Sequence, residues 1–87
     1  MLNENKAREI VESIKGESAG SINYLGIQLI PSITSYALFP DELKSKVHVF
    51  EALDKGNNHT ICQYYVNSNG SIYKDTYPMD LNCIKIK

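Results

Sequence analysis

The sequence predicts an α+β domain in which an N-terminal helix packs on a four- to five-stranded antiparallel sheet, together with a short second helix. Apolar residues recur at helical spacing near the N-terminus, and the pattern changes to alternation in short segments from residue 47 onward. The length of 87 residues fits a single domain, residues 1–87, with a small core and little room for a deep substrate cavity.

The N-terminal helix is predicted from the segment LNENKAREIVESIKG. The stripe expected to face the core consists of Ala7, Ile10, Val11 and Ile14. We expect Asn3 to cap the start by accepting a hydrogen bond from a free backbone N–H, and Glu4 to pair with Arg8 one turn later. Gly16 is expected to end the helix in a left-handed conformation.

The middle of the chain predicts two strands and the short second helix. The first strand runs from Ile22 to Ile30 and stops at a proline, and Gly26 is expected to mark a bulge or a close backbone approach. The second strand is expected at about residues 34–39. The segment PDELKSK then supplies proline and acidic residues for a helix start and lysines for its end.

The C-terminal half predicts a meander of antiparallel strands in VHVFEAL, HTICQYYV, SIYKDTY and LNCIKIK, separated by turn residues. Asn69-Gly70 fits a two-residue hairpin turn, with a four-residue loop over residues 67–70 as the alternative. Both loop lengths put the same residues on each face. One predicted face holds Cys62, Tyr64, Val66, Tyr73 and Asp75. The other predicted face holds Ile61, Gln63, Tyr65, Ile72 and Lys74.

Charge and hydropathy argue against several classes of partner. Nine Lys and Arg residues oppose ten Asp and Glu residues without a basic block, so we expect no nucleic-acid partner. No run approaches the roughly 18 apolar residues of a membrane span, and the start MLNENKAREI lacks the apolar region of a signal peptide. We therefore expect a cytoplasmic protein without a membrane partner, unless a signal peptide has been removed.

The sequence also argues against a phosphate loop and a metal site, and we expect no cofactor. The loop ESAGSI follows a helix, and no lysine follows Gly20, as a Walker motif would require. His59 and Cys62 are three residues apart on a predicted strand and therefore point to opposite faces. Paired short spacings typical of structural zinc sites are missing among the candidate ligands His48, His59, Cys62 and Cys83.

Cys62 and His48 are the one nucleophile and base pair that the predicted strands could bring to a shared face. No glycine-rich elbow accompanies them, so we expect a protein without enzyme activity. We expect reduced structural thiols at Cys62 and Cys83, with one bridge between them as the alternative.

The helix segment ENKAREIVESIKG and the hairpin segment YYVNSNGSIYK together resemble the small helix-plus-hairpin modules of the PepSY and immunity-protein type. The hairpins of such modules combine an aromatic strand, an Asn or Asp turn with Gly, and a short return strand. The residues that fit this outline are Tyr64, Tyr65, Asn69, Gly70 and Ile72. The chain departs from the pattern in lacking tryptophan and in its long middle segment, residues 25–53. The resemblance implies an inhibitor or interaction role instead of catalysis.

These observations predict a small cytosolic protein-binding module, an inhibitor or immunity-type protein of bacterial origin that acts by stoichiometric binding to another protein. Tyrosines would serve as its amphipathic anchors. The predicted partner-binding residues are Gln63, Tyr65, Ile72 and Lys74. The alternative is a homo-oligomeric structural or accessory protein that pairs edge strands or sheet faces. A small enzyme using Cys62 or His48 is the third hypothesis.

Overall fold

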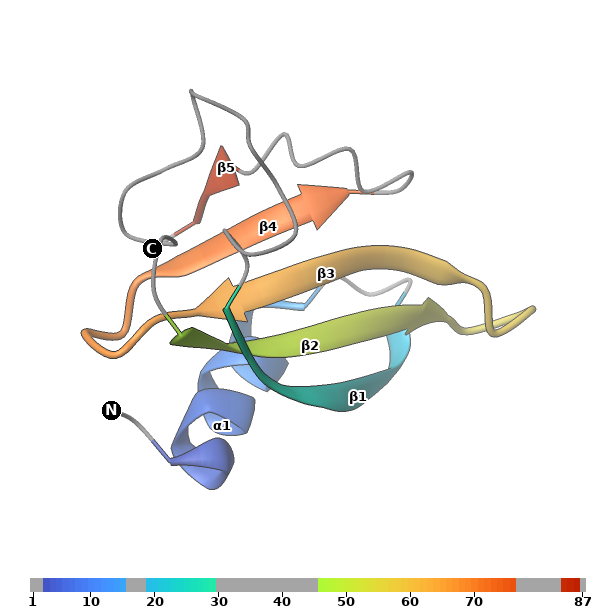
Figure 1. The fold of residues 1–87 in the computed structure, drawn as a ribbon. Helices are drawn as coiled ribbons and strands as arrows, with labels where there is room; N and C mark the ends of the chain where they lie inside the picture. The colour runs from blue at the N-terminus through green and yellow to red at the C-terminus, as the bar shows by residue number, and fades with distance from the viewer. Residues whose placement is uncertain (1–2, 16–18, 30–45, 77–83, 87) are drawn as a thin grey trace.

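The computed structural model describes residues 3–15, 19–29, 46–76 and 84–86, which form one helix and a five-stranded sheet (Figure 1). The elements are α1 (Glu4–Ile14), β1 (Ala19–Leu29), β2 (Lys46–Asp54), β3 (Thr60–Val66), β4 (Ile72–Thr76) and β5 (Ile84–Lys85). The strands lie in the order β1-β2-β3-β4-β5, and every neighbouring pair is antiparallel. This confirms the α+β class with an N-terminal helix and an antiparallel sheet. The predicted second helix and the strand at residues 34–39 lie outside the described residues.

Helix α1 begins as the sequence predicts. The Asn3 side chain accepts a hydrogen bond from the Lys6 backbone N–H at 2.8 Å, and Arg8 lies 3.6 Å from the Glu4 carboxylate. The helix lies against one face of the sheet (Figure 1), to which it presents the fully buried Ala7 and Val11. The predicted cap at Gly16 lies outside the described residues.

The face of the sheet that α1 covers holds the main core, and we call it the helix face. Phe50 of β2 lies opposite Tyr64 of β3, and Val66 of β3 lies opposite Ile72 of β4, all with buried side chains. Because directly opposed residues share a face, these two pairs place four large apolar side chains on the helix face. The buried core cluster comprises Ala7, Val11, Ala19, Ile22, Phe50, Ala52, Cys62, Tyr64, Val66 and Ile72.

The opposite face of the sheet is buried as well. Val47 and Val49 alternate with helix-face residues along β2 and expose at most 1% of their surface. Tyr65 lies directly opposite Tyr73 on this face, and both side chains are buried. Strand β2 is therefore buried on both sides over residues 47–50.

The turn between β3 and β4 has three residues, 68–70, instead of two or four. The Asn67 N–H donates to the Ser71 carbonyl at 3.1 Å, and the Gly70 N–H donates to the Asn67 carbonyl at 3.1 Å. Gly70 has φ 90°, as expected for the three-residue hairpin loop whose last residue adopts a left-handed conformation. The Asn67 side chain also accepts from the Asn69 and Ser71 N–H groups at 3.1 and 3.0 Å, which stabilises this loop over a shorter one.

Strand β1 carries the irregularity that was predicted at Gly26. Its register with β2 shifts between Tyr24 and Gly26, and Gly26 has φ 98°. The extra residue, Leu25, bends the strand and increases its local twist. Since β1 has β2 as its one neighbour in the described sheet, the bulge lies on an edge strand.

Candidate functional site

The four residues predicted to bind a partner do not lie together. Gln63 and Tyr65 point to the face opposite α1, whereas Ile72 and Lys74 lie opposite Val66 and Tyr64 on the helix face. The prediction of a shared face was wrong because the three-residue turn changes the pairing by one residue, which moves every side chain of β4 to the other face.

The two apolar members of that set are internal. Tyr65 exposes 2% of its surface, and its hydroxyl group donates to the Gln63 side chain at 3.0 Å and lies 3.4 Å from the buried carboxylate of Asp75. Ile72 is fully buried in the helix-face core. Gln63 and Lys74 are partly exposed, on opposite faces. The expectation that Tyr65 and Ile72 share an accessible surface is therefore also wrong.

Three large apolar side chains of β1 are exposed, more than on any other described strand. We call Leu25, Ile27 and Leu29 the β1 row; they are 37%, 50% and 46% exposed. The row begins at the bulge, and Ile27 lies opposite His48 of β2. The alternating sequence of this segment predicts a strand but does not predict the exposure of its apolar side. A signal was present, because β1 contains no charged residue over 11 positions.

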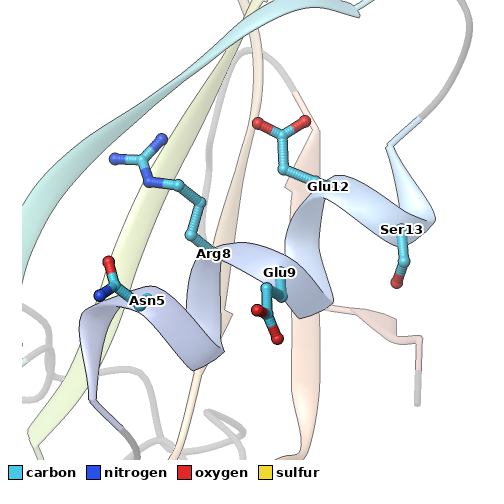
Figure 2. Close-up of a pocket in the computed structure, with 5 residues that line it drawn as sticks. All are labelled: Asn5, Arg8, Glu9, Glu12 and Ser13. Carbon is cyan, nitrogen blue, oxygen red and sulfur yellow. The ribbon is translucent and has the colours of Figure 1, made fainter.

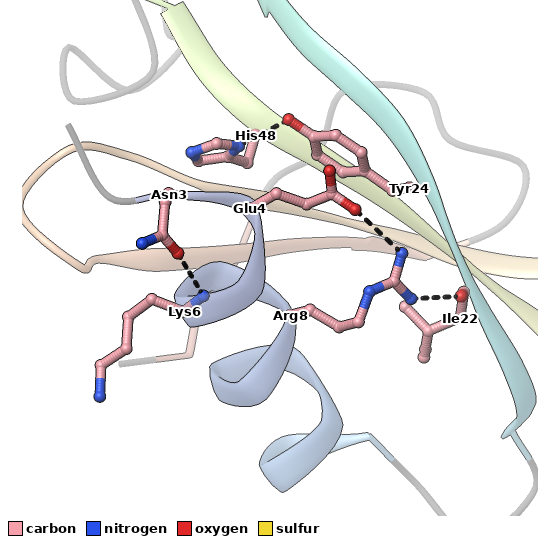
Figure 3. Close-up of polar contacts among 7 residues, drawn as sticks. All are labelled: Asn3, Glu4, Lys6, Arg8, Ile22, Tyr24 and His48. Carbon is pink, nitrogen blue, oxygen red and sulfur yellow. Dashed lines mark hydrogen bonds and ion pairs between the residues drawn. The ribbon is translucent and has the colours of Figure 1, made fainter.

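A polar cluster joins α1 to the sheet beside the β1 row (Figure 3). The hydroxyl oxygen of Tyr24 in β1 lies 2.8 Å from the Nδ1 atom of the buried His48. The Tyr24 ring packs against the Phe50 ring, with 5.0 Å between the ring centroids. Burial, together with the nearby Glu4 carboxylate, raises the pKa of the Tyr24 hydroxyl group. Arg8 of α1 pairs with that same carboxylate and packs over the Phe50 ring. The cluster therefore fixes the helix against β1 and β2.

Cys62 and His48 do share the helix face, a placement that the predicted strands allowed, but they lie too far apart to form a catalytic pair. His48 lies opposite Val66 and Cys62 lies opposite Ala52, with the Phe50–Tyr64 pair between them. Four residues of strand separate the two positions by about 13 Å. Cys62 is a free, buried thiol, and burial raises its pKa, so the reactive thiolate is disfavoured.

An open hollow runs along the outer side of α1 (Figure 2). Its lining residues all belong to the helix, and Arg8 and Glu12 project to one side while Glu9 and Ser13 project to the other. Glu9 pairs with Lys6 of the same helix at 3.8 Å, and Glu12 pairs with Lys15, the C-terminal cap of the helix, at 3.1 Å. These exposed pairs describe a solvated helix surface, and no set of polar groups converges there on a ligand.

Within the described ranges, no group of three His, Cys, Asp or Glu side chains is arranged to hold a metal ion. The helix that the structure describes is too short to cross a membrane.

Comparisons of the chain with protein-family models, with curated proteins and with solved structures found no match.

Proposed function

We propose that this protein is a small protein-binding module that acts by stoichiometric binding to another protein and uses the β1 row as its contact surface. The observation that carries the proposal is the exposure of Leu25, Ile27 and Leu29 on an edge strand without charged residues. Exposed apolar side chains gathered on one element are typical of protein interaction sites.

The burial of the tyrosines moves the proposed contact surface away from the β3–β4 hairpin. Tyr64, Tyr65 and Tyr73 are all buried, and the Tyr65 hydroxyl group is used inside the sheet. They cannot act as anchors without unfolding the hairpin. The β1 row needs no rearrangement, since Ile27 already exposes half of its surface.

An inhibitor or immunity role is the form of binding that the resemblance of the helix and hairpin segments implies. Binding without catalysis is supported by the separation of Cys62 from His48 and by the burial of both side chains. The free thiol of Cys62 fits a reducing compartment, which supports the cytosol as the place of action.

Self-association is the second candidate function, and the same strand favours it. An edge strand without charged residues or proline lacks two of the features by which proteins prevent strand pairing, although it carries a bulge. A homo-oligomeric accessory protein would use this edge to join copies of the chain.

The test of the proposed function is capture of partners from the native host by tagged protein, followed by mass spectrometry and titration of any partner found. The variant is Ile27→Lys, which places a charge in the β1 row. Ile84→Lys is the matched control, because Ile84 is also an exposed isoleucine but lies on β5. We expect Ile27→Lys to lose the partner and Ile84→Lys to keep it with wild-type affinity. Equal binding by Ile27→Lys would contradict the proposed contact surface.

A further inference from the structure

We propose that Arg8 of α1 closes the outer edge of β1 and so prevents two copies of this chain from pairing through their β1 strands. This inference goes beyond the proposed function, because it concerns what keeps the molecule from binding itself and holds whether or not a different protein is the partner.

Strand β1 has the properties of a strand that pairs with its own copy. It spans 11 residues at the edge of the sheet that the structure describes, and it carries no charged side chain. Two copies of one strand can pair antiparallel about a twofold axis, and two uncharged strands meet without charge repulsion. The three exposed apolar side chains of the β1 row would lose part of their exposure in the same contact. A second copy is therefore the occupant that this edge fits.

Arg8 occupies a backbone group that such a pairing would use. Its Nη1 atom donates a hydrogen bond to the Ile22 carbonyl of β1 at 2.9 Å (Figure 3). In an antiparallel pair, alternate residues point their N–H and C=O groups away from the neighbouring strand. Because the Ile22 carbonyl accepts from a helix side chain, we infer that it points from β1 towards the open edge.

The guanidinium group is held in this position from several sides. Its Nη2 atom lies 3.6 Å from the Glu4 carboxylate, and the group lies 5.5 Å from the centroid of the Phe50 ring. The ion pair and the ring contact already restrict the Arg8 side chain, so the hydrogen bond to the Ile22 carbonyl costs little additional side-chain entropy. A strand from a second copy would have to displace it.

Two features of β1 act in the same direction further along the strand. The Gln28 side chain donates to the Leu25 carbonyl at 3.2 Å, and the bulge between Tyr24 and Gly26 interrupts the regular spacing of edge groups. Of these three features, only Arg8 lies outside β1, so its contribution can be removed by a substitution that leaves the sequence of β1 unchanged.

The test uses the full chain with Arg8→Met, which keeps an unbranched side chain over Phe50 but has no donor for the Ile22 carbonyl. Light scattering at increasing protein concentration measures the mass. We expect the wild type to stay at 9.8 kDa and Arg8→Met to rise towards twice that mass. The double variant Arg8→Met, Ile27→Lys should return to the monomer mass, because the added charge lies in the pairing strand.

Lys6→Met is the matched control, since it removes a positive charge from an exposed position of α1 whose ammonium group pairs with Glu9. It should remain monomeric. Association of Lys6→Met to the same extent, a monomeric Arg8→Met with a native circular dichroism spectrum, or a wild-type dimer would each overturn the proposal. If Arg8→Met does not fold, Glu4→Gln decides: it frees Arg8 from its carboxylate and should raise the mass, and an unchanged mass would overturn the proposal.

Discussion

Gly70 holds the β3–β4 turn in a backbone conformation that other residues adopt at a cost. Its φ is 90°, and a Cβ atom added there would meet no atom within 4 Å, so a substitution would be strained through the backbone alone. We predict that Gly70→Ala lowers the free energy of unfolding by about 1 to 2 kcal/mol, measured by urea denaturation. Ser68→Ala, at an exposed position of the same turn, is the control and should change stability little. Equal stabilities of the two variants would contradict the strained geometry.

The thiol of Cys62 makes stability depend on alkaline pH. Its pKa is raised from 9.0 mainly by burial, so above pH 9 the folded state binds more protons at this group than the unfolded state does. The free energy of unfolding should therefore fall as pH rises through and above 9. The buried Tyr64 hydroxyl group, whose pKa is also raised by burial, adds a fall at higher pH.

Urea denaturation between pH 7 and pH 10 measures this dependence. Cys62→Ala removes the thiol contribution, so the fall in stability above pH 9 should become shallower in the variant. Its lower absolute stability, which follows from lost packing, does not affect the comparison of slopes. Parallel pH profiles for wild type and variant would show that the thiol does not contribute.

At the scale of elements, α1 was predictable and the faces of β4 were not. The helix depends on local spacing and a cap, both of which lie within residues 3–14 and follow general rules. The face of each β4 residue depends on whether the preceding turn has an odd or an even number of residues. Asn69-Gly70 fits several turns, and the choice is made by the Asn67 side chain, which accepts from two N–H groups of the loop.

The exposure of the β1 row could not be predicted for a different reason. Alternation of Leu25, Ile27 and Leu29 correctly indicates a strand, but it does not say whether the apolar side is covered. Coverage depends on the position of the strand in the sheet and on the reach of α1, which contacts β2 and leaves the row exposed. The sequence therefore supplies the strand, while the tertiary arrangement decides which of its residues are accessible.

The cap of α1 gives a prediction at the same scale. Asn3→Ala removes the acceptor for the Lys6 N–H, so we expect the free energy of unfolding to fall by about 1 kcal/mol. Asn5→Ala is the matched control, because Asn5 is an exposed residue inside the first turn and is not the cap. Thermal unfolding followed by circular dichroism distinguishes the two. A larger loss for Asn5→Ala would show that the cap does not hold the helix start.

For the whole molecule, the sheet has a stable centre and less protected edges. Phe50 and Tyr64 lie opposite each other on β2 and β3, and each of these strands is paired on both sides. Strand β2 contributes buried side chains both to the helix-face core and to the opposite face of the sheet. Unfolding of β2 would expose buried side chains on both faces of the sheet, so we expect the described sheet to lose its centre only in global unfolding.

Hydrogen exchange of the backbone amides measures this hierarchy. We predict the slowest exchange at Phe50 and Tyr64, with opening free energies close to the global free energy of unfolding found in urea. Ile84 and Lys85 of β5 should exchange fastest among the strands, because this element has two residues with exposed side chains and pairs with β4 on one side. Protection of β5 equal to that of β2 would contradict this order. Faster exchange at Phe50 than in β1 would contradict a centre built on β2, because in the described sheet β1 has one strand neighbour and β2 has two.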